Sequence, residues 1–161
     1  MSFHWSHWRS RLAQLLLALW WGGFTFYTTA VVHVGTQVLH SATKQGFITQ
    51  QVAHYLHALG GLALAAVLWE LSARRKASQA RRLDEIAWLV AVLALLAQVP
   101  VHFQMTALLD IPHREVLNEI RFYQFHRLYL CLATTQWLGS LLLLLGWPAA
   151  TLPTPAQAPG G

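Results

Sequence analysis

Four long apolar runs dominate the sequence, and they limit what the chain can fold into more than any other feature. They cover about residues 12–40, 52–71, 86–109 and 122–145, and the first run ends in a more polar stretch. A helix needs about twenty apolar residues to cross a bilayer, because each residue advances the helix axis by about 1.5 Å. The pattern therefore predicts an all-α domain over residues 1–147, built as a bundle of four transmembrane helices.

The composition agrees with a membrane protein and excludes several other classes. Charged residues make up 11% of the 161 residues and hydrophobic residues 55%, whereas soluble domains carry about 25% charged residues. The single cysteine, Cys131, excludes an internal disulfide framework and cysteine zinc sites. Residues 148–161 are rich in Pro, Ala and Gly, and we expect this tail to be disordered.

Basic residues between the apolar runs predict the orientation of the chain in the membrane. Seven of them fall on one side of a four-span topology and four on the other: Arg9, Arg11, Arg74, Arg75, Lys76, Arg81 and Arg82 against Lys44, Arg114, Arg121 and Arg127. Cytoplasmic loops carry an excess of Lys and Arg, so we expect both termini in the cytoplasm and the chain in the plasma (inner) membrane. Basic residues in such loops favour a lipid bilayer as partner and argue against nucleic acid.

Seven of the nine histidines lie at the four helix ends that this topology places on the opposite, extracytoplasmic face. They are His33, His40, His54, His57, His102, His113 and His126. Each run also carries polar residues at helical spacing. They are Thr29, His33, Gln37 and His40 in the first; Gln50, His54 and His57 in the second; Gln98 and His102, which share a face with Met105, in the third; and Glu119, Tyr123, His126, Arg127 and Thr134 in the fourth. Polar side chains within a membrane turn away from lipid. We therefore expect the four stripes to face one another and to bring imidazoles from all four helices into one pocket.

Imidazoles on facing helices can hold haem iron from two sides or coordinate a metal ion. For haem b, the expected axial pairs are His57 with His126, or His102 with His126. For copper, zinc or iron, the expected ligands are three of five histidines with a carboxylate from Glu119 or Asp110; the five are His33, His54, His57, His102 and His126. The zinc-protease motif HExxH and a Glu-x-x-His pair are both absent from the sequence, so the usual zinc-protease and di-iron sites are not predicted.

The same residues can act without a cofactor. His102 or His126 is then the proton carrier, Tyr123 a hydrogen-bond donor, and Arg127 the partner of an anionic substrate group. Arg127 can instead form an ion pair with Glu119 or Asp110, or lie against a lipid phosphate. Histidines near helix ends can also be interfacial residues that prefer the headgroup region.

Three segments resemble a known group of membrane proteins. They are Trp21-Gly-Gly-Phe-Thr-Phe-Tyr27, Val99-Pro-Val-His-Phe-Gln-Met-Thr-Ala-Leu-Leu109 and Phe122-Tyr-Gln-Phe-His-Arg-Leu-Tyr129. In these segments the chain resembles the small four-helix membrane proteins of the anthrone-oxygenase-like family, with His102 at a place where many relatives carry asparagine. The resemblance implies the four-helix fold and an oxygenase or other redox role on a hydrophobic aromatic substrate. It places His102, His126 and Arg127 at the matching site positions.

Two function classes are consistent with these observations. The first is a membrane redox protein that uses the histidine cluster. The second is a non-enzymatic membrane subunit or scaffold, in a homo-oligomer or a larger membrane complex, whose polar helix ends bind lipid headgroups or a partner protein. The pairs Gly22-Gly23 and Gly60-Gly61 also predict close contact between the first two helices.

Overall fold

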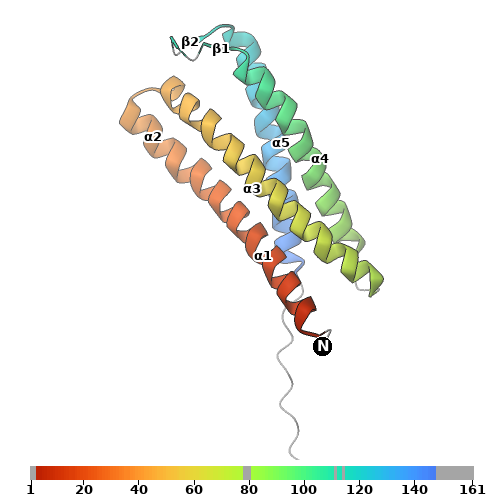
Figure 1. Cartoon of the computed structure of the whole chain (residues 1–161). Helices are drawn as coiled ribbons and strands as arrows, with labels where there is room; N and C mark the ends of the chain where they lie inside the picture. Colours follow the sequence, from red (N-terminus) through yellow and green to blue (C-terminus); the bar gives the residue numbers. More distant parts are fainter. Residues whose placement is uncertain (1–2, 78–80, 111, 114, 148–161) are drawn as a thin grey trace, which may run out of the picture.

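The fold is a bundle of long helices joined by short turns (Figure 1). The computed structural model describes residues 3–77, 81–110, 112–113 and 115–147, so the tail predicted to be disordered lies outside the described residues. The elements in chain order are α1 (Phe3–Phe26), the π-helical turn η1 (Tyr27–Val31), α2 (Val32–Leu39), α3 (Ala42–Lys76), α4 (Arg82–Thr106), β1 (Leu109–Asp110), β2 (Glu115–Val116) and α5 (Glu119–Leu145). The two strands form a small antiparallel hairpin between α4 and α5.

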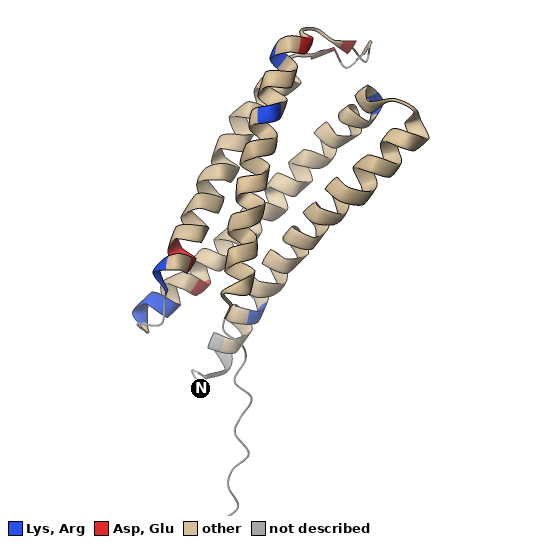
Figure 2. Cartoon of the chain, turned by 180° about the vertical axis from the view of Figure 1, so that it is seen from behind, with Lys and Arg blue, Asp and Glu red and all other residues tan. Residues whose placement is uncertain are grey.

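Among the described residues, four helices are long and apolar enough to cross a membrane, counting α1, η1 and α2 as one continuous helix. The spans are His7–Leu39, Ala42–Lys76, Arg82–Thr106 and Glu119–Leu145. The predicted all-α bundle of four transmembrane helices is therefore confirmed, and the chain is a multi-pass membrane protein. Charged side chains gather at the two ends of the bundle and leave its middle uncharged, as a bilayer requires (Figure 2).

Local capping explains where the helices turn. The Ser41 hydroxyl accepts a hydrogen bond from the Lys44 backbone N–H at the start of α3, at 3.2 Å. Asn118 caps α5 in the same way, accepting from the Arg121 N–H at 3.0 Å. His40 ends α2 in the left-handed conformation, with φ 47°. A side chain at Gly35 would overlap that of Gln45, so this glycine lets α2 and α3 lie close together beside their turn.

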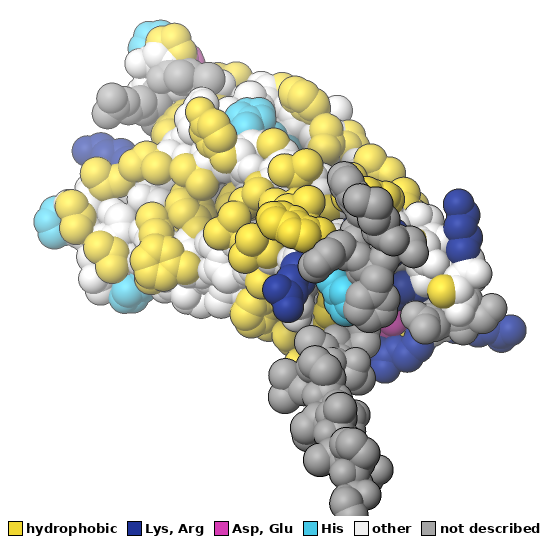
Figure 3. Space-filling view, turned by 60° about the horizontal axis from the view of Figure 1, so that its bottom comes forward, with side chains coloured by type: hydrophobic (Ala, Val, Ile, Leu, Met, Phe, Trp, Pro, Cys, Tyr) yellow, Lys and Arg dark blue, Asp and Glu magenta, His cyan; other side chains and the backbone are white. Residues whose placement is uncertain are grey.

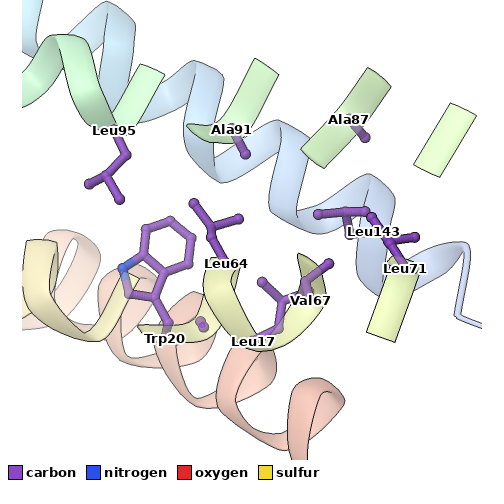
Figure 4. Close-up of a cluster of buried hydrophobic side chains, with 10 residues drawn as sticks. Leu17, Trp20, Leu64, Val67, Leu71, Ala87, Ala91, Leu95 and Leu143 are labelled. Carbon is purple, nitrogen blue, oxygen red and sulfur yellow. The ribbon is translucent and has the colours of Figure 1, made fainter. Parts of the chain in front are cut away.

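The hydrophobic core lies in the half of the bundle that contains the start of α1. Figure 4 shows its members, which come from all four spans: Leu17, Trp20, Ala63, Leu64, Val67, Leu71, Ala87, Ala91, Leu95 and Leu143. Small residues let α4 and α5 approach there, since a Cβ added at Gly139 would lie 3.0 Å from the Ala87 carbonyl oxygen. This half holds the four spans together.

The predicted glycine contacts are confirmed for only one of the two pairs. A Cβ added at Gly60 would lie 2.7 Å from Trp20 Nε1 on α1 and 3.0 Å from Gln136 Nε2 on α5. Among the described residues of other elements, no atom lies within 4 Å of a Cβ added at Gly22 or Gly23. Gly60 therefore permits close packing, whereas Gly22 and Gly23 face outward from the chain.

Toward the other end, the helices separate into two pairs. α2 runs along α3, and α4 runs along α5 up to the β1–β2 hairpin (Figures 1 and 2). The helix ends that carry the clustered histidines belong to this separated half. The side chains that connect the two pairs here are polar, and they form the candidate site.

Candidate functional site

Rings from three helices meet at the junction of α3, α4 and α5. His102 on α4 lies between two histidines of α3, with ring centroids 4.8 Å from His54 and 5.4 Å from His57. Both contacts are edge-to-face, with interplanar angles of 88° and 86°. Tyr129 on α5 completes the group, with its ring centroid 5.8 Å from His57 and 6.1 Å from His102. We call these four side chains, His54, His57, His102 and Tyr129, the ring cluster.

A hydrogen bond joins two members of the ring cluster across helices. The Tyr129 hydroxyl oxygen lies 3.0 Å from His57 Nε2. When the imidazole carries its proton on Nδ1, the phenol donates to Nε2; in the other tautomer the phenol accepts. Either tautomer therefore keeps the two side chains joined by a hydrogen bond.

Helical spacing explains why these residues meet. His54 and His57 are three residues apart on α3, so both lie on the side of that helix that faces α4. Gln98 and His102 are four residues apart on α4, and both are buried. On α5 the side that faces the bundle has the same spacing through Tyr129, Ala133, Gln136 and Ser140, the last three of them buried.

Amide and hydroxyl side chains close the ring cluster on both sides along the bundle. On the side of the β1–β2 hairpin, Gln50 Nε2 donates to Thr106 Oγ1 at 3.1 Å and ties α3 to α4. On the side of the hydrophobic core, Gln98 Nε2 donates to Gln136 Oε1 at 2.6 Å and ties α4 to α5. Gln98 and Gln136 are each only 2% exposed. The ring cluster thus lies in a polar seam that fixes the three helices relative to one another.

Several polar atoms of this seam are buried without a hydrogen-bond partner in the described part of the chain. They are His102 Nε2, Gln136 Nε2 and Ser140 Oγ. His102 is 5% exposed, so its free nitrogen is enclosed by protein. An unpaired buried polar atom costs about 1–3 kcal/mol, and a polar group of a bound molecule would recover part of that cost.

The prediction that all four helices contribute to one pocket is wrong, because the first helix does not take part. His33 is exposed and bonds Gln37 on its own helix at 3.1 Å. The whole stripe of Thr29, His33, Gln37 and His40 is exposed. α2 lies along α3 in this half of the bundle, and the polar seam is already filled by side chains of α3, α4 and α5.

His126 also lies apart from the ring cluster. Its ring stacks on Phe122, one turn earlier on α5, at a centroid distance of 6.1 Å and an angle of 7°. Its Nδ1 is buried and has no hydrogen-bond partner among the described residues. The two expected haem pairs both require His126, and this arrangement does not bring it into contact with His57 or His102.

The expected polar face of the fourth helix is wrong, and a different face is buried. Tyr123 is 59% exposed, and Glu119, Arg127 and Thr134 are exposed as well. Within the described part of the chain, Arg127 forms no ion pair with Glu119 or Asp110; Asp110 contacts His113 Nδ1 at 2.9 Å instead.

Tyr129 and Gln136 are site residues that sequence reasoning missed. The regular spacing of 129, 133, 136 and 140 was the signal that could have found them, since it marks one side of a helix.

Three imidazoles of the ring cluster come from the residues expected to bind a metal ion: His54, His57 and His102. As they stand, no three His, Cys, Asp or Glu side chains in the described ranges are arranged to hold one ion. The metal and haem assignments therefore stay predictions. What the present geometry offers is a buried imidazole with a free nitrogen beside a phenol–imidazole pair.

Comparison with known proteins adds no relative to this picture. Neither a protein-family model, nor a curated protein, nor a solved structure matches the chain. The function must therefore be argued from the ring cluster and its surroundings.

Proposed function

We propose that this membrane protein binds a hydrophobic small molecule at the ring cluster and exchanges a proton with it. The observation that carries the proposal is the environment of His102. This residue is buried, its Nε2 has no hydrogen-bond partner among the described residues, and its ring centroid lies 5.4 Å from that of His57. A neutral imidazole with a free nitrogen can accept a proton and return it, as general acid–base catalysis requires. A hydrophobic ligand dissolves in the lipid bilayer and would reach the site from there, without passing through water.

The contacts of the ring cluster support a separate role for each of its groups. His102 Nε2 accepts a proton from the bound molecule, because it is the nitrogen without a partner. The His57–Tyr129 pair donates a hydrogen bond to an oxygen of the same molecule as negative charge develops there. General acid–base catalysis of this kind contributes about a hundredfold or more to a rate.

The resemblance to anthrone-oxygenase-like proteins supports an oxidation as the reaction class. In such a reaction His102 would remove a proton from the ring carbon opposite the ketone of an anthrone. The resulting carbanion gives electrons to dioxygen and forms a hydroperoxide, which loses water to leave a second ketone. The sum is one anthrone and one dioxygen converted to one anthraquinone and one water, so dioxygen is the oxidant.

The test is oxygen uptake by the full chain in lipid nanodiscs with anthrone as the probe, together with anthraquinone formation. We expect one anthraquinone per dioxygen at a rate above that of empty nanodiscs. His102→Ala should lower this rate about a hundredfold, whereas His113→Ala, which removes an imidazole outside the cluster, should not. A rate equal to that of empty nanodiscs, or equal rates for His102→Ala and the unmodified chain, would contradict the proposal.

A metal site is the second candidate, favoured by the three close imidazoles of His54, His57 and His102. Neutral imidazole is a ligand for copper, zinc and iron, and a rotation of these rings would be needed to converge on one ion. Metal analysis of the purified protein tests this, with a visible spectrum before and after dithionite as the test for haem. Stoichiometric metal that is lost in His102→Ala would favour a redox centre over metal-free proton transfer.

The non-enzymatic alternative also has an observation in its favour. The exposed stripe of Thr29, His33 and Gln37 lies within a membrane span, where polar groups gain from a helical partner. A second copy or another membrane subunit could cover it. Size analysis in detergent tests this reading: substitution of the three residues by Leu would then reduce the assembled species.

The orientation with both termini in the cytoplasm of the plasma (inner) membrane is part of the same proposal. Seven Lys and Arg residues at one end of the spans, against four at the other, support it. A reporter fused to the C-terminus that is active only in the cytoplasm tests it. Activity of a periplasm-dependent reporter at the same position would reverse the assignment.

A further inference from the structure

The end of the bundle where α1 begins and α3 ends carries a surplus of positive charge. Figure 3 looks at the molecule from this end and shows its Lys and Arg side chains at the surface. The cations are Arg9, Arg11, Arg74, Arg75, Lys76, Arg81 and Arg82, and the acids are Glu70, Asp84 and Glu85. Seven cations against three acids leave this end strongly positive.

Each of the three acids is already held by an arginine of the same end. Glu70 accepts from Arg9 Nε at 2.7 Å and from Arg74 Nε at 2.9 Å. Asp84 pairs with Arg81 at 2.9 Å.

Glu85 pairs with Arg75, and it also attracts Arg82 from beyond ion-pair distance. The acids therefore bind the first helix, α3 and the start of α4 together, and their closest partners are the four arginines at positions 9, 74, 75 and 81.

Three cations are left with exposed side chains: Arg11, Lys76 and Arg82. Within the described ranges, none of them forms an ion pair with an acid of the chain. They come from α1, α3 and α4, so three helices contribute to the positive surface of this end. We call these three residues the free cations.

The opposite end of the bundle has no comparable surplus. Its described cations are Lys44, Arg121 and Arg127, and its described acids are Asp110, Glu115 and Glu119. The two ends of the bundle thus differ in charge within the described part of the chain. Substitutions of Lys and Arg at the opposite end therefore serve as a matched control for the effect of charge on binding.

Indole rings place the free cations at the level of lipid headgroups. Trp147 donates from Nε1 to Ser10 Oγ at 3.2 Å, and the Arg74 guanidinium lies 4.6 Å from the Trp147 ring centroid. Trp69 is exposed on α3, two turns before Lys76. Tryptophan prefers the boundary between hydrocarbon and headgroup, and residues one or two turns beyond it reach the phosphates.

We propose that the free cations bind the headgroups of anionic phospholipids in the leaflet at this end. The charge of the surface and its depth beside the indoles select an anionic headgroup over a zwitterionic one. A Lys or Arg near an anionic membrane surface strengthens binding about fivefold. This inference is independent of the ring cluster, which lies in the other half of the bundle.

The experiment is a lipid titration of the full chain followed by native mass spectrometry, with phosphatidylglycerol as the anionic probe and phosphatidylcholine as the zwitterionic one. We expect the unmodified protein to retain phosphatidylglycerol preferentially. The double substitution Lys76→Gln and Arg82→Gln should weaken phosphatidylglycerol binding about twenty-five-fold. The double substitution Lys44→Gln and Arg121→Gln removes the same two residue types at the other end and should change binding less than about twofold.

Arg11→Gln is a second, single variant on a different helix, and its expected effect is about fivefold. All of these side chains are exposed, so helix content measured by circular dichroism should be unchanged. Equal losses in the two double variants would show binding to charge in general and overturn the proposal. Unchanged phosphatidylglycerol binding in the Lys76 and Arg82 double variant would overturn it as well.

Discussion

The Tyr129 hydroxyl oxygen lies 3.0 Å from His57 Nε2, which joins α5 to α3 across 72 positions of the sequence. Both residues also contact the buried His102 ring on α4. The Tyr129 side chain therefore contributes both to the packing of three membrane spans and to the candidate site. Stability and function should change together when this contact is removed.

Tyr129→Phe removes the hydroxyl and keeps the ring, so it tests the hydrogen bond alone. We expect a loss of about 1 kcal/mol in stability, the usual net value of one hydrogen bond, seen as a lower unfolding temperature in detergent. Tyr123→Phe is the control, because Tyr123 is exposed, and it should leave the unfolding temperature unchanged. An equal shift in both variants would show that the hydroxyl of Tyr129 has no special role.

The Gln98–Gln136 hydrogen bond should show strong coupling between its two residues. Gln136→Leu leaves one N–H of the Gln98 amide buried without its 2.6 Å partner, at a cost of about 1–3 kcal/mol, while the other N–H can still donate to the Ala94 carbonyl oxygen at 3.3 Å. Replacing both residues by Leu removes both polar groups, so the double variant should be less destabilised than the sum of the single variants. The unfolding temperatures of the four proteins test this, and strictly additive shifts would contradict the coupling.

Gly60 and Gly22 should respond in opposite ways to the same substitution. Gly60→Ala places a Cβ 2.7 Å from Trp20 Nε1, and that indole is held by its bond to the Leu56 carbonyl oxygen at 3.0 Å. Overpacking of this kind costs about 1–3 kcal/mol. Gly22→Ala meets no atom of another described element within 4 Å and should leave thermal stability unchanged or raise it. If both variants unfold at the same temperature, the close contact at Gly60 is not real.

Glu70 should matter far more to stability than Glu85. Glu70→Gln leaves the buried Arg74 guanidinium without its carboxylate, and breaking a buried ion pair in this way costs about 3 kcal/mol. Glu85→Gln affects a pair with the exposed Arg75 and should not move the unfolding temperature measurably. The same thermal assay at low salt compares the two, and a larger effect at Glu85 would be inconsistent with the observed burial.

The fold and part of the site could be predicted because they depend on regular helices. Apolar length alone gives the four spans, and the spacing of Gln98 and His102 correctly places both on a buried face. Helical spacing also brings His54 and His57 onto one side of α3. These inferences do not require the arrangement of the helices to be known. They require only that polar groups within a membrane prefer the bundle interior.

The first helix could not be predicted in the same way, because its pitch changes. Its buried face runs through Leu17, Trp20 and Tyr27, and η1 then begins at Tyr27. A π-helical turn adds a residue and rotates the next helical segment, here α2, by about 100°. On α2 the partly buried positions include Val32, Gly35 and Leu39, whereas His33 is exposed. Neither residue type nor spacing in this segment marks the change.

Tyr129 was missed for a different reason. It lies among apolar residues, whereas Tyr123 and Arg127 form the more obviously polar pattern nearby. Which side of α5 faces the bundle is decided by its close packing against α4 at Gly139. That choice depends on the partner helix, so the sequence of α5 alone leaves it open.

The most direct measurement is the distance between Tyr129 and His57 in a lipid bilayer. Solid-state NMR on protein with ¹³C at tyrosine Cζ and ¹⁵N in the histidine rings reports it through dipolar dephasing. One of the tyrosine signals should dephase with a ¹³C–¹⁵N distance of about 4 Å, one C–O bond beyond the hydrogen bond, and this signal should vanish in Tyr129→Phe but persist in Tyr123→Phe. If the unmodified protein and Tyr129→Phe show the same dephasing of their tyrosine signals, Tyr129 does not lie beside a histidine ring. In that case α5 does not meet α3 at this point, and the ring cluster does not form.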